Sequence, residues 1–131
     1  MFDWRRPTNL GVKDGRLAPP RRTPNCVSSQ ADPADREHYI APLAFKGPTA
    51  KAMSAARAAV QSMERSTIVR EEGPYLYAEY RSKLLGYVDD LELYFDEKAG
   101  AFHVRSASRL GRKDFGVNRK RVEALRRKLS A

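Results

Sequence analysis

The middle of the chain alternates between apolar and polar residues, a period of two that indicates β-strands. Three segments follow this period, 75–82, 87–95 and 101–109, and a β-branched run over 66–72 precedes them. Their apolar positions share one face: Leu76, Ala78, Tyr80, Leu91, Leu93, Phe95, Phe102 and Val104. Short polar connections between the segments favour hairpins. We therefore expect an antiparallel sheet with one apolar face and one polar, partly solvated face.

Two segments have the spacing of amphipathic helices, one before and one after the predicted sheet. Apolar residues recur every three or four positions at Met53, Ala56, Val60 and Met63, and again at Val122, Leu125 and Leu129. Asn118 precedes the second stripe and is a residue type that commonly caps a helix start. We predict an α+β fold, an antiparallel meander sheet of three or four strands with two helices on one face.

The first 48 residues are rich in proline and follow neither period. Four prolines and six basic residues lie in the first 24 positions, which disfavours regular structure there. We expect residues 1–24 to form an extended or disordered basic arm and residues 25–131 to form a single α+β domain. Within that domain, residues 25–48 are expected to be irregular.

The chain is strongly positive, and the charge is concentrated at its end. Its 131 residues include 25 Lys and Arg against 16 Asp and Glu, a formal net charge of +9. Residues 101–131 carry ten basic and two acidic side chains, a net +8. Such a region attracts anionic small molecules, lipid head groups or acidic protein surfaces. The alternative is a basic helix face that is merely solvated.

Composition also disfavours several classes of site and location. No apolar run approaches the ~20 residues of a membrane-spanning helix. The first residues lack the apolar stretch of a signal peptide, so we expect a cytoplasmic location. One cysteine excludes an internal disulfide, and only two histidines are present. No nucleotide, dinucleotide or metal motif is found, and we expect no cofactor and no metal.

Six short runs resemble one family in their order and spacing. They are Pro24-Asn25-Cys26-Val27-Ser28-Ser29, His38-Tyr39-Ile40-Ala41-Pro42, Tyr75-Leu76-Tyr77-Ala78-Glu79, Gly86-Tyr87-Val88-Asp89-Asp90-Leu91-Glu92, Val104-Arg105-Ser106-Ala107-Ser108-Arg109-Leu110-Gly111 and Asp114-Phe115-Gly116-Val117-Asn118-Arg119. Over about residues 21–129 the chain resembles the bacterial and plastid domain-of-unknown-function family numbered 1499. The resemblance implies no established activity. Many members of that family look envelope-associated and carry a leading signal or membrane segment, which the start of this chain does not resemble.

The first of these runs raises the question of a cysteine nucleophile. Cys26 would need a nearby cation or helix start to hold it as a thiolate, and an oriented histidine partner. The alternative is a small buried apolar residue that anchors the arm. The second interpretation is the commoner role of a lone cysteine, so we expect no catalytic residue here.

Polar residues at the strand ends and near the last helix predict two neighbouring sites. Asp89 shares the face of Leu91 and therefore needs polar partners. We expect a structural polar cluster made of Asn25, Cys26, Ser28, Ser29, Asp89, Asp90 and Asp114. We also expect a small anion-binding site, because guanidinium forks suit phosphate and carboxylate. Its residues are Arg105, Ser106, Ser108, Arg109, Asn118 and Arg119.

The polar face of the sheet has two interpretations. Its acidic and basic side chains could form cross-strand ion pairs of small energy, or it could be a recognition face with Tyr77 and Tyr94 as contact platforms. We expect a small non-catalytic binding or accessory module that recognises an anionic ligand, a lipid head group or an acidic protein surface through the basic C-terminal region. A nucleic-acid-binding protein is one alternative, although no nucleic-acid motif is recognised. A Cys-dependent enzyme is the other.

Overall fold

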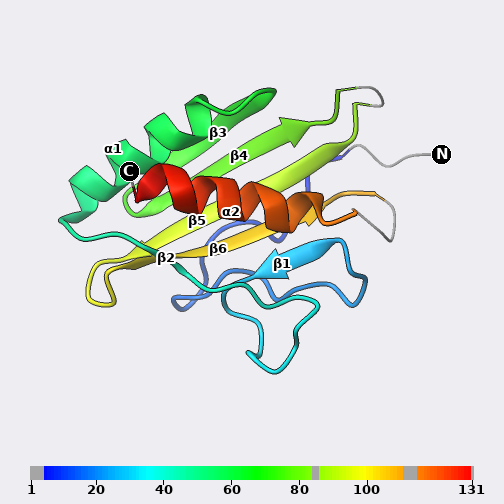
Figure 1. Cartoon of the computed structure of the whole chain (residues 1–131), viewed down its shortest axis with the longest axis horizontal. Coiled ribbons are helices and arrows are strands. Elements are labelled where there is room, and N and C mark those ends of the chain that lie inside the picture. Colours follow the sequence, from blue (N-terminus) through cyan, green and yellow to red (C-terminus); the bar gives the residue numbers. More distant parts are fainter. Residues whose placement is uncertain (1–4, 84–85, 111–114, 131) are drawn as a thin grey trace.

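The fold was determined as a computed structural model. The structure describes residues 5–83, 86–110 and 115–130. Its elements, in chain order, are β1 (Cys26–Ser28), β2 (Leu43–Ala44), α1 (Thr49–Gln61), β3 (Ser66–Glu72), β4 (Tyr75–Arg81), β5 (Val88–Asp96), β6 (Ala101–Ser108) and α2 (Val117–Leu129). The protein is an α+β structure in which one antiparallel sheet carries both helices (Figure 1). The predicted fold class is confirmed.

The sheet has more strands than the sequence predicted. β3, β4, β5 and β6 form the expected antiparallel meander, with ends within about one residue of the predicted segments. The expectation of three or four strands is wrong, because β1 and β2 both pair with β6 and give a six-stranded sheet. These two strands are three and two residues long. Strands this short cannot show an alternation of apolar and polar residues in the sequence. They form because the edge of β6 offers backbone groups to pair with.

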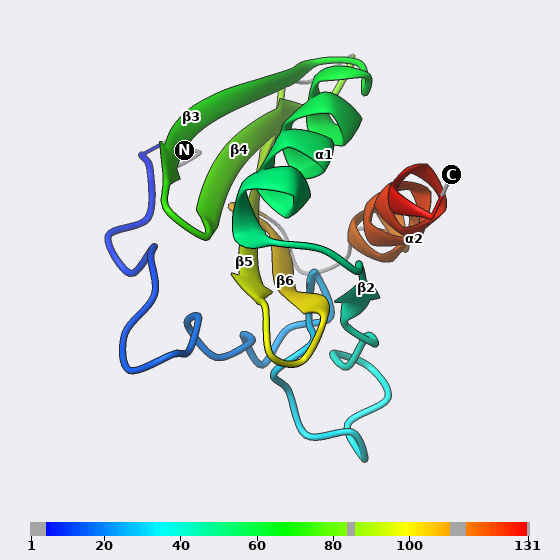
Figure 2. The same ribbon diagram turned by 90° about the vertical axis from the view of Figure 1, so that its left-hand side faces the viewer.

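Both helices cover the same face of the sheet. α1 packs over β3, β4 and β5, whereas α2 packs over β6, β1 and β2, and the helices also contact each other (Figure 2). The predicted apolar positions of the sheet and of α2 fill the core between the layers. α1 presents mostly alanine to the sheet, which allows a close approach. A cluster of three aromatic rings, Phe45, Phe95 and Phe102, closes one end of this core.

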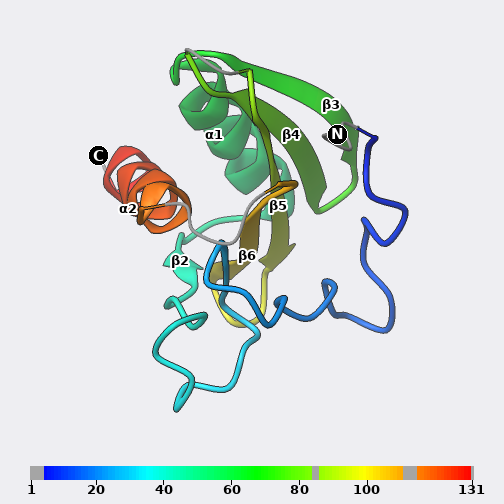
Figure 3. The same ribbon diagram turned by 90° about the vertical axis from the view of Figure 1, so that its right-hand side faces the viewer.

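The opposite face of the sheet is covered by the N-terminal arm, residues 5–24. The arm runs across that face on the side away from the helices (Figure 2 and Figure 3). Leu17 of the arm is buried against Tyr75 and Tyr77, and Leu10 and Val12 pack around them. The expectation of a partly solvated polar face is therefore wrong over the centre of the sheet: the side chains there are buried beneath a strap of chain.

Candidate functional site

The centre of the covered face is a network of ionised side chains around Arg109. Arg109 donates from Nε and Nη2 to the Asp90 carboxylate, at 3.0 and 2.9 Å, and from Nη2 to Glu79 at 2.5 Å. The Tyr77 hydroxyl donates to both carboxylates. Arg6 of the arm reaches Glu79 at 2.8 Å. The Arg109 and Asp90 side chains are 6% and 2% exposed, so this ion pair is removed from water.

A second buried carboxylate, Glu92, lies further along the same face. It accepts hydrogen bonds from the Tyr75 hydroxyl at 2.6 Å and from the backbone N–H of Gly11 in the arm at 2.7 Å. Arg105 lies opposite Glu92 on β6 and donates to the Pro19 carbonyl. Glu92 Oε1 and Arg105 Nε are both buried with no hydrogen-bond partner among the described residues. We call the residues on this face the arm-side network: Tyr75, Tyr77, Glu79, Asp90, Glu92, Arg105 and Arg109.

Burial and charge act in opposite directions on the carboxylates of this network. Burial opposes ionisation of Glu79, but hydrogen bonds from Arg6, Tyr77 and Arg109 outweigh it and lower its pKa to about 2. Burial raises the pKa of Glu92, and its bonds to Gly11 and Tyr75 only partly oppose that effect. Burial and the neighbouring carboxylates also raise the pKa of both tyrosines. The two phenols therefore stay protonated and act as hydrogen-bond donors.

A separate polar network lies on the helix side of the sheet. Asn118, in the first turn of α2, is fully buried and does not cap the helix; the cap position belongs to Gly116, so the prediction for Asn118 is wrong. Its side chain accepts from Ser106 and donates to Ser108 and to the Asn25 carbonyl. These bonds attach the start of α2 to β6 and to the residue before β1.

The six residues of the predicted anion site lie on both sides of the sheet. Ser106, Ser108 and Asn118 meet on the helix side, as just described. Arg105 in β6 points to the arm, because successive residues of a strand alternate between faces, and Arg109, directly after β6, lies on the same side. Arg119 instead donates to the carbonyls of Arg36 and Glu37. The structure thus divides the predicted site, and anion binding by these residues stays a prediction.

The predicted polar cluster is likewise spread over several places. Asn25 donates to the Leu110 carbonyl, Ser28 and Ser29 accept from the backbone N–H of Gln30 and Val104, and Asp89 pairs with Arg121 at 2.9 Å. Asp90 belongs to the arm-side network, and Asp114 lies outside the described residues. Cys26 is fully buried in β1. That burial favours the anchoring role over the nucleophile.

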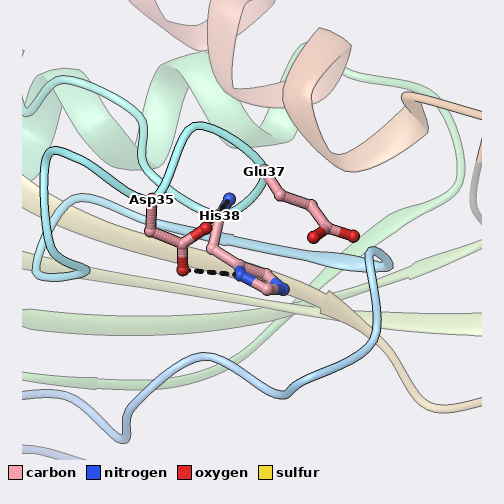
Figure 4. A group of neighbouring side chains, drawn as sticks. All are labelled: Asp35, Glu37 and His38. Atoms are coloured by element: carbon pink, nitrogen blue, oxygen red, sulfur yellow. Dashed lines mark hydrogen bonds and ion pairs between the residues drawn. The ribbon is translucent and has the colours of Figure 1, made fainter.

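His38 is the centre of a small polar group that includes Asp35 and Glu37 (Figure 4). Its Nδ1 lies 2.7 Å from the Asp35 carboxylate and its Nε2 lies 2.8 Å from the Thr23 carbonyl. Potential ligand atoms of the three residues lie within 4.8 Å of one another. Both ring nitrogens already face acceptors, so a metal would have to displace one of these bonds. The geometry favours a hydrogen-bonded imidazolium that attaches the loop to the end of the arm.

The protonation of His38 should be visible as a pH dependence of stability. Burial lowers the pKa of His38, but its bonds to Thr23 and Asp35 outweigh burial and raise it above 6.5. A raised pKa means that His38 stabilises the folded state fully below about pH 6.5 and loses this contribution as the pH rises through its folded-state pKa. We expect Asp35→Asn to lower the titration midpoint of the ring in an NMR titration. An unchanged midpoint would contradict the assigned contact.

A basic groove lies between the end of α1, the end of β4 and the exposed side of α2. Its volume is about 580 Å³, and its basic lining residues are Arg65, Arg81, Lys120, Arg121 and Lys128. Glu64 and Asp89 also line it, which leaves a local excess of three positive charges. Arg121 is fixed by Asp89 and stacks over the Tyr80 ring at 4.4 Å. Because α2 lies within residues 101–131, which carry a net charge of +8, the groove contains part of the basic region predicted from the sequence.

Sequence reasoning missed the covering of the arm-side network. It assigned Glu79, Glu92 and Arg105 to a surface, yet they are 9%, 0% and 4% exposed. Two signals were present. Three tyrosines at 75, 77 and 94 fall on the nominally polar face, and apolar residues at 10, 12 and 17 interrupt the arm. Together these form the second, smaller apolar cluster.

Comparison with known proteins supports the resemblance found in the sequence. A family model described as protein of unknown function (DUF1499) matches residues 16–129. The chain belongs to the DUF1499 family. The match spans both helices, all six strands and residues 16–24 of the arm, so the shared region includes every helix and strand described above. No curated protein matches the chain.

One further finding concerns membranes. None of the helices in the described part of this DUF1499 chain has the length and apolar character needed to cross a bilayer. Both helices have 13 residues, and α2 is strongly basic.

Proposed function

We propose that this protein is a small non-catalytic binding module that recognises an anionic small molecule through the basic groove beside α2. One observation carries the proposal: Arg81, Lys120 and Lys128 line the groove and have no ion pair within the part of the chain that the structure describes. Most other basic residues of α2 are engaged. Arg126, for example, bonds to Glu123 and to the carbonyls of Ala41 and Pro42.

The chemistry of the groove fits an anion with an organic part. Arg121 is held rigidly, so its guanidinium needs little further ordering to contact a ligand. The side chains of Lys120 and Lys128 are flexible, so their ammonium groups can adjust their positions to the bound anion. Met63, Tyr80 and Ala124 supply apolar surface beside these charges. Pockets that bind small molecules commonly combine such an apolar lining with a few polar groups.

The proposal can be tested with pyrophosphate as the probe. In an NMR titration at low ionic strength, we expect saturable shifts at α2 and at the end of β4 in the unmodified protein. The double variant K120Q/K128Q should weaken binding about tenfold or more, equivalent to about 1.4 kcal/mol. The matched control is K46Q/K98Q, because both of its exposed lysines lie away from the groove. Equal binding by the two variants would contradict the proposal.

The same variants separate the proposal from its rivals. Anionic vesicles and an acidic protein can be tested with the same variants. If either one bound K46Q/K98Q but not K120Q/K128Q, it would replace the small molecule as the proposed partner of the groove. Duplex DNA that bound at ~50 mM salt and lost affinity steeply with added salt would favour the nucleic-acid alternative. A cytoplasmic location, expected from the first residues of the chain, stays a prediction.

A further inference from the structure

We propose that Glu92 is a pH-dependent switch for the N-terminal arm. Residues 8–13 of the arm lie on the sheet while Glu92 is protonated, and they detach from it as Glu92 ionises. Glu92 lies on β5 beneath the arm, which crosses the face opposite the helices (Figure 3). The switch is therefore separate from the groove beside α2, and it does not depend on ligand binding there.

The segment 8–13 is lightly attached to the sheet. Gly11 is its one buried residue, whereas Leu10 and Val12 are half-buried and the others are exposed. The backbone N–H of Gly11 donates to Glu92 Oε2 at 2.7 Å. Segments with few buried contacts open locally at a small cost in free energy. The bond to Glu92 is therefore a main attachment of this segment.

The arm is held more firmly on both sides of this segment. Before it, Arg6 pairs with Glu79 at 2.8 Å. After it, Leu17 is buried against the sheet, and its N–H donates to the Gln30 side chain at 2.8 Å. Residues 8–13 can therefore leave the sheet as a short loop while the rest of the arm stays in place.

The hydrogen bonds of Glu92 favour its neutral form in the docked arrangement. Gly11 and Tyr75 both donate to the same oxygen, Oε2. The other oxygen, Oε1, is buried and has no partner within the described part of the chain. An ionised carboxylate buried with one oxygen unbonded costs more than a neutral carboxyl group with one unpaired O–H. Docking of the arm thus opposes ionisation.

Arg105 provides a partner for ionised Glu92 when the segment detaches. The two residues lie directly opposite each other on β6 and β5. In the docked arrangement, Arg105 Nη2 donates to the Pro19 carbonyl of the arm at 3.3 Å, and its Nε is buried without a partner among the described residues. Once water reaches Glu92, Arg105 can turn to the carboxylate and form a cross-strand ion pair. The detached state therefore accommodates the charge that the docked state disfavours.

The charges around Glu92 act in both directions, and burial outweighs those that favour ionisation. Burial raises the pKa of Glu92; the bonds from Gly11 and Tyr75 and the charge of Arg105 oppose this rise, and Asp90 adds to it. The ionisable side chains that surround Glu92 are Arg70 of β3, Tyr75 and Tyr77 of β4, Asp90 and Tyr94 of β5, His103 and Arg105 of β6, and Lys13 of the arm.

The sign of the pH dependence follows from this difference between the two states. Glu92 in water ionises near its ordinary pKa of 4.5, and docking of the arm raises that value. Detachment therefore releases a proton. The opening equilibrium should be constant below about pH 4.5. Above it, opening should increase by up to about tenfold per pH unit, the limit for one proton, and level off above the pKa of the docked state.

The experiment measures hydrogen exchange of the Gly11 amide by NMR, on the full chain, at several pH values from 4 to 8. We expect its protection factor, which is corrected for the intrinsic exchange rate, to fall as the pH rises. The Leu93 amide, in the central strand β5, reports global unfolding and should stay more protected. Glu92→Gln should remove the fall at Gly11. The matched control is Glu64→Gln, an 83% exposed glutamate that should leave the fall unchanged.

A Gly11 protection factor that stays constant with pH, or that falls equally in E92Q, would overturn the proposal. His38, which bonds to the Thr23 carbonyl near the end of the arm, is present in every variant, so its titration does not affect this comparison. If circular dichroism shows that E92Q has not folded, an NMR titration of the Glu92 carboxyl carbon in the unmodified protein replaces it. A midpoint above 4.5 is expected, and a midpoint at or below 4.5 would overturn the proposal.

Discussion

Replacing Asp90 by alanine should lower the free energy of unfolding by about 3–5 kcal/mol, the range observed when one partner of a buried ion pair is removed. The Asp90 carboxylate accepts two hydrogen bonds from Arg109 and one from Tyr77. Without it, a guanidinium that is 6% exposed loses the two hydrogen bonds that Asp90 accepts, while its ion pair with Glu79 remains. Urea unfolding at pH 7, followed by circular dichroism, measures the change.

A surface ion pair provides the matched control for this variant. Arg57 and Glu71 form a bidentate pair at 2.9 and 2.6 Å, but their side chains are 44% and 26% exposed. Glu71→Ala should therefore cost less than about 1 kcal/mol. Losses of equal size in D90A and E71A would show that the arm does not exclude water from the network. Adding Arg109→Met to D90A should recover part of the lost stability, because it removes the buried charge that Asp90 had balanced.

The sequence predicted the helix-side core well because that core is made of regular, local elements. Leu76, Leu91, Leu93 and Phe102 are all fully buried, as their alternation predicted. The strands that carry them are joined by short hairpins, so their pairing needs little information from distant residues. Periods of two and 3.6 were sufficient for this half of the molecule.

The arm-side network could not be predicted in the same way. Its covering depends on contacts between residues far apart in the chain, such as Gly11 with Glu92 and Arg105 with Pro19. Besides its three apolar residues, the arm meets the sheet through backbone groups and arginines, and these give no periodic signal. For the anion site, however, alternation alone separates Arg105 from Ser106. The expectation of one site containing both conflicted with the pattern that predicted the strand.

Glu79 should make the protein sensitive to acid, and its removal should abolish that part of the pH dependence. Arg6, Tyr77 and Arg109 hold the pKa of Glu79 at about 2, against an ordinary value of 4.5. A lowered pKa stabilises the folded state fully above about pH 4.5, and this contribution is lost as the pH falls toward 2. The difference in pKa corresponds to roughly 3 kcal/mol at pH 7, about 2 kcal/mol of which is lost by pH 3.

The measurement is the difference in free energy of unfolding between the unmodified protein and Glu79→Gln, taken at several pH values from 7 to 3. Glutamine keeps the size and a carbonyl acceptor of glutamate but cannot ionise. We expect the difference to be largest at pH 7 and to shrink as the solution is acidified. Glu92, whose raised pKa gives the opposite pH dependence, is present in both proteins and cancels.

Glu64→Gln is the control for this titration, because the Glu64 side chain is 83% exposed. Its difference from the unmodified protein should stay small at every pH. A pH-independent difference for E79Q would mean that Glu79 titrates normally in the folded protein. In that case the hydrogen bonds from Arg6 and Arg109 would not favour the ionised form of Glu79 in the folded protein.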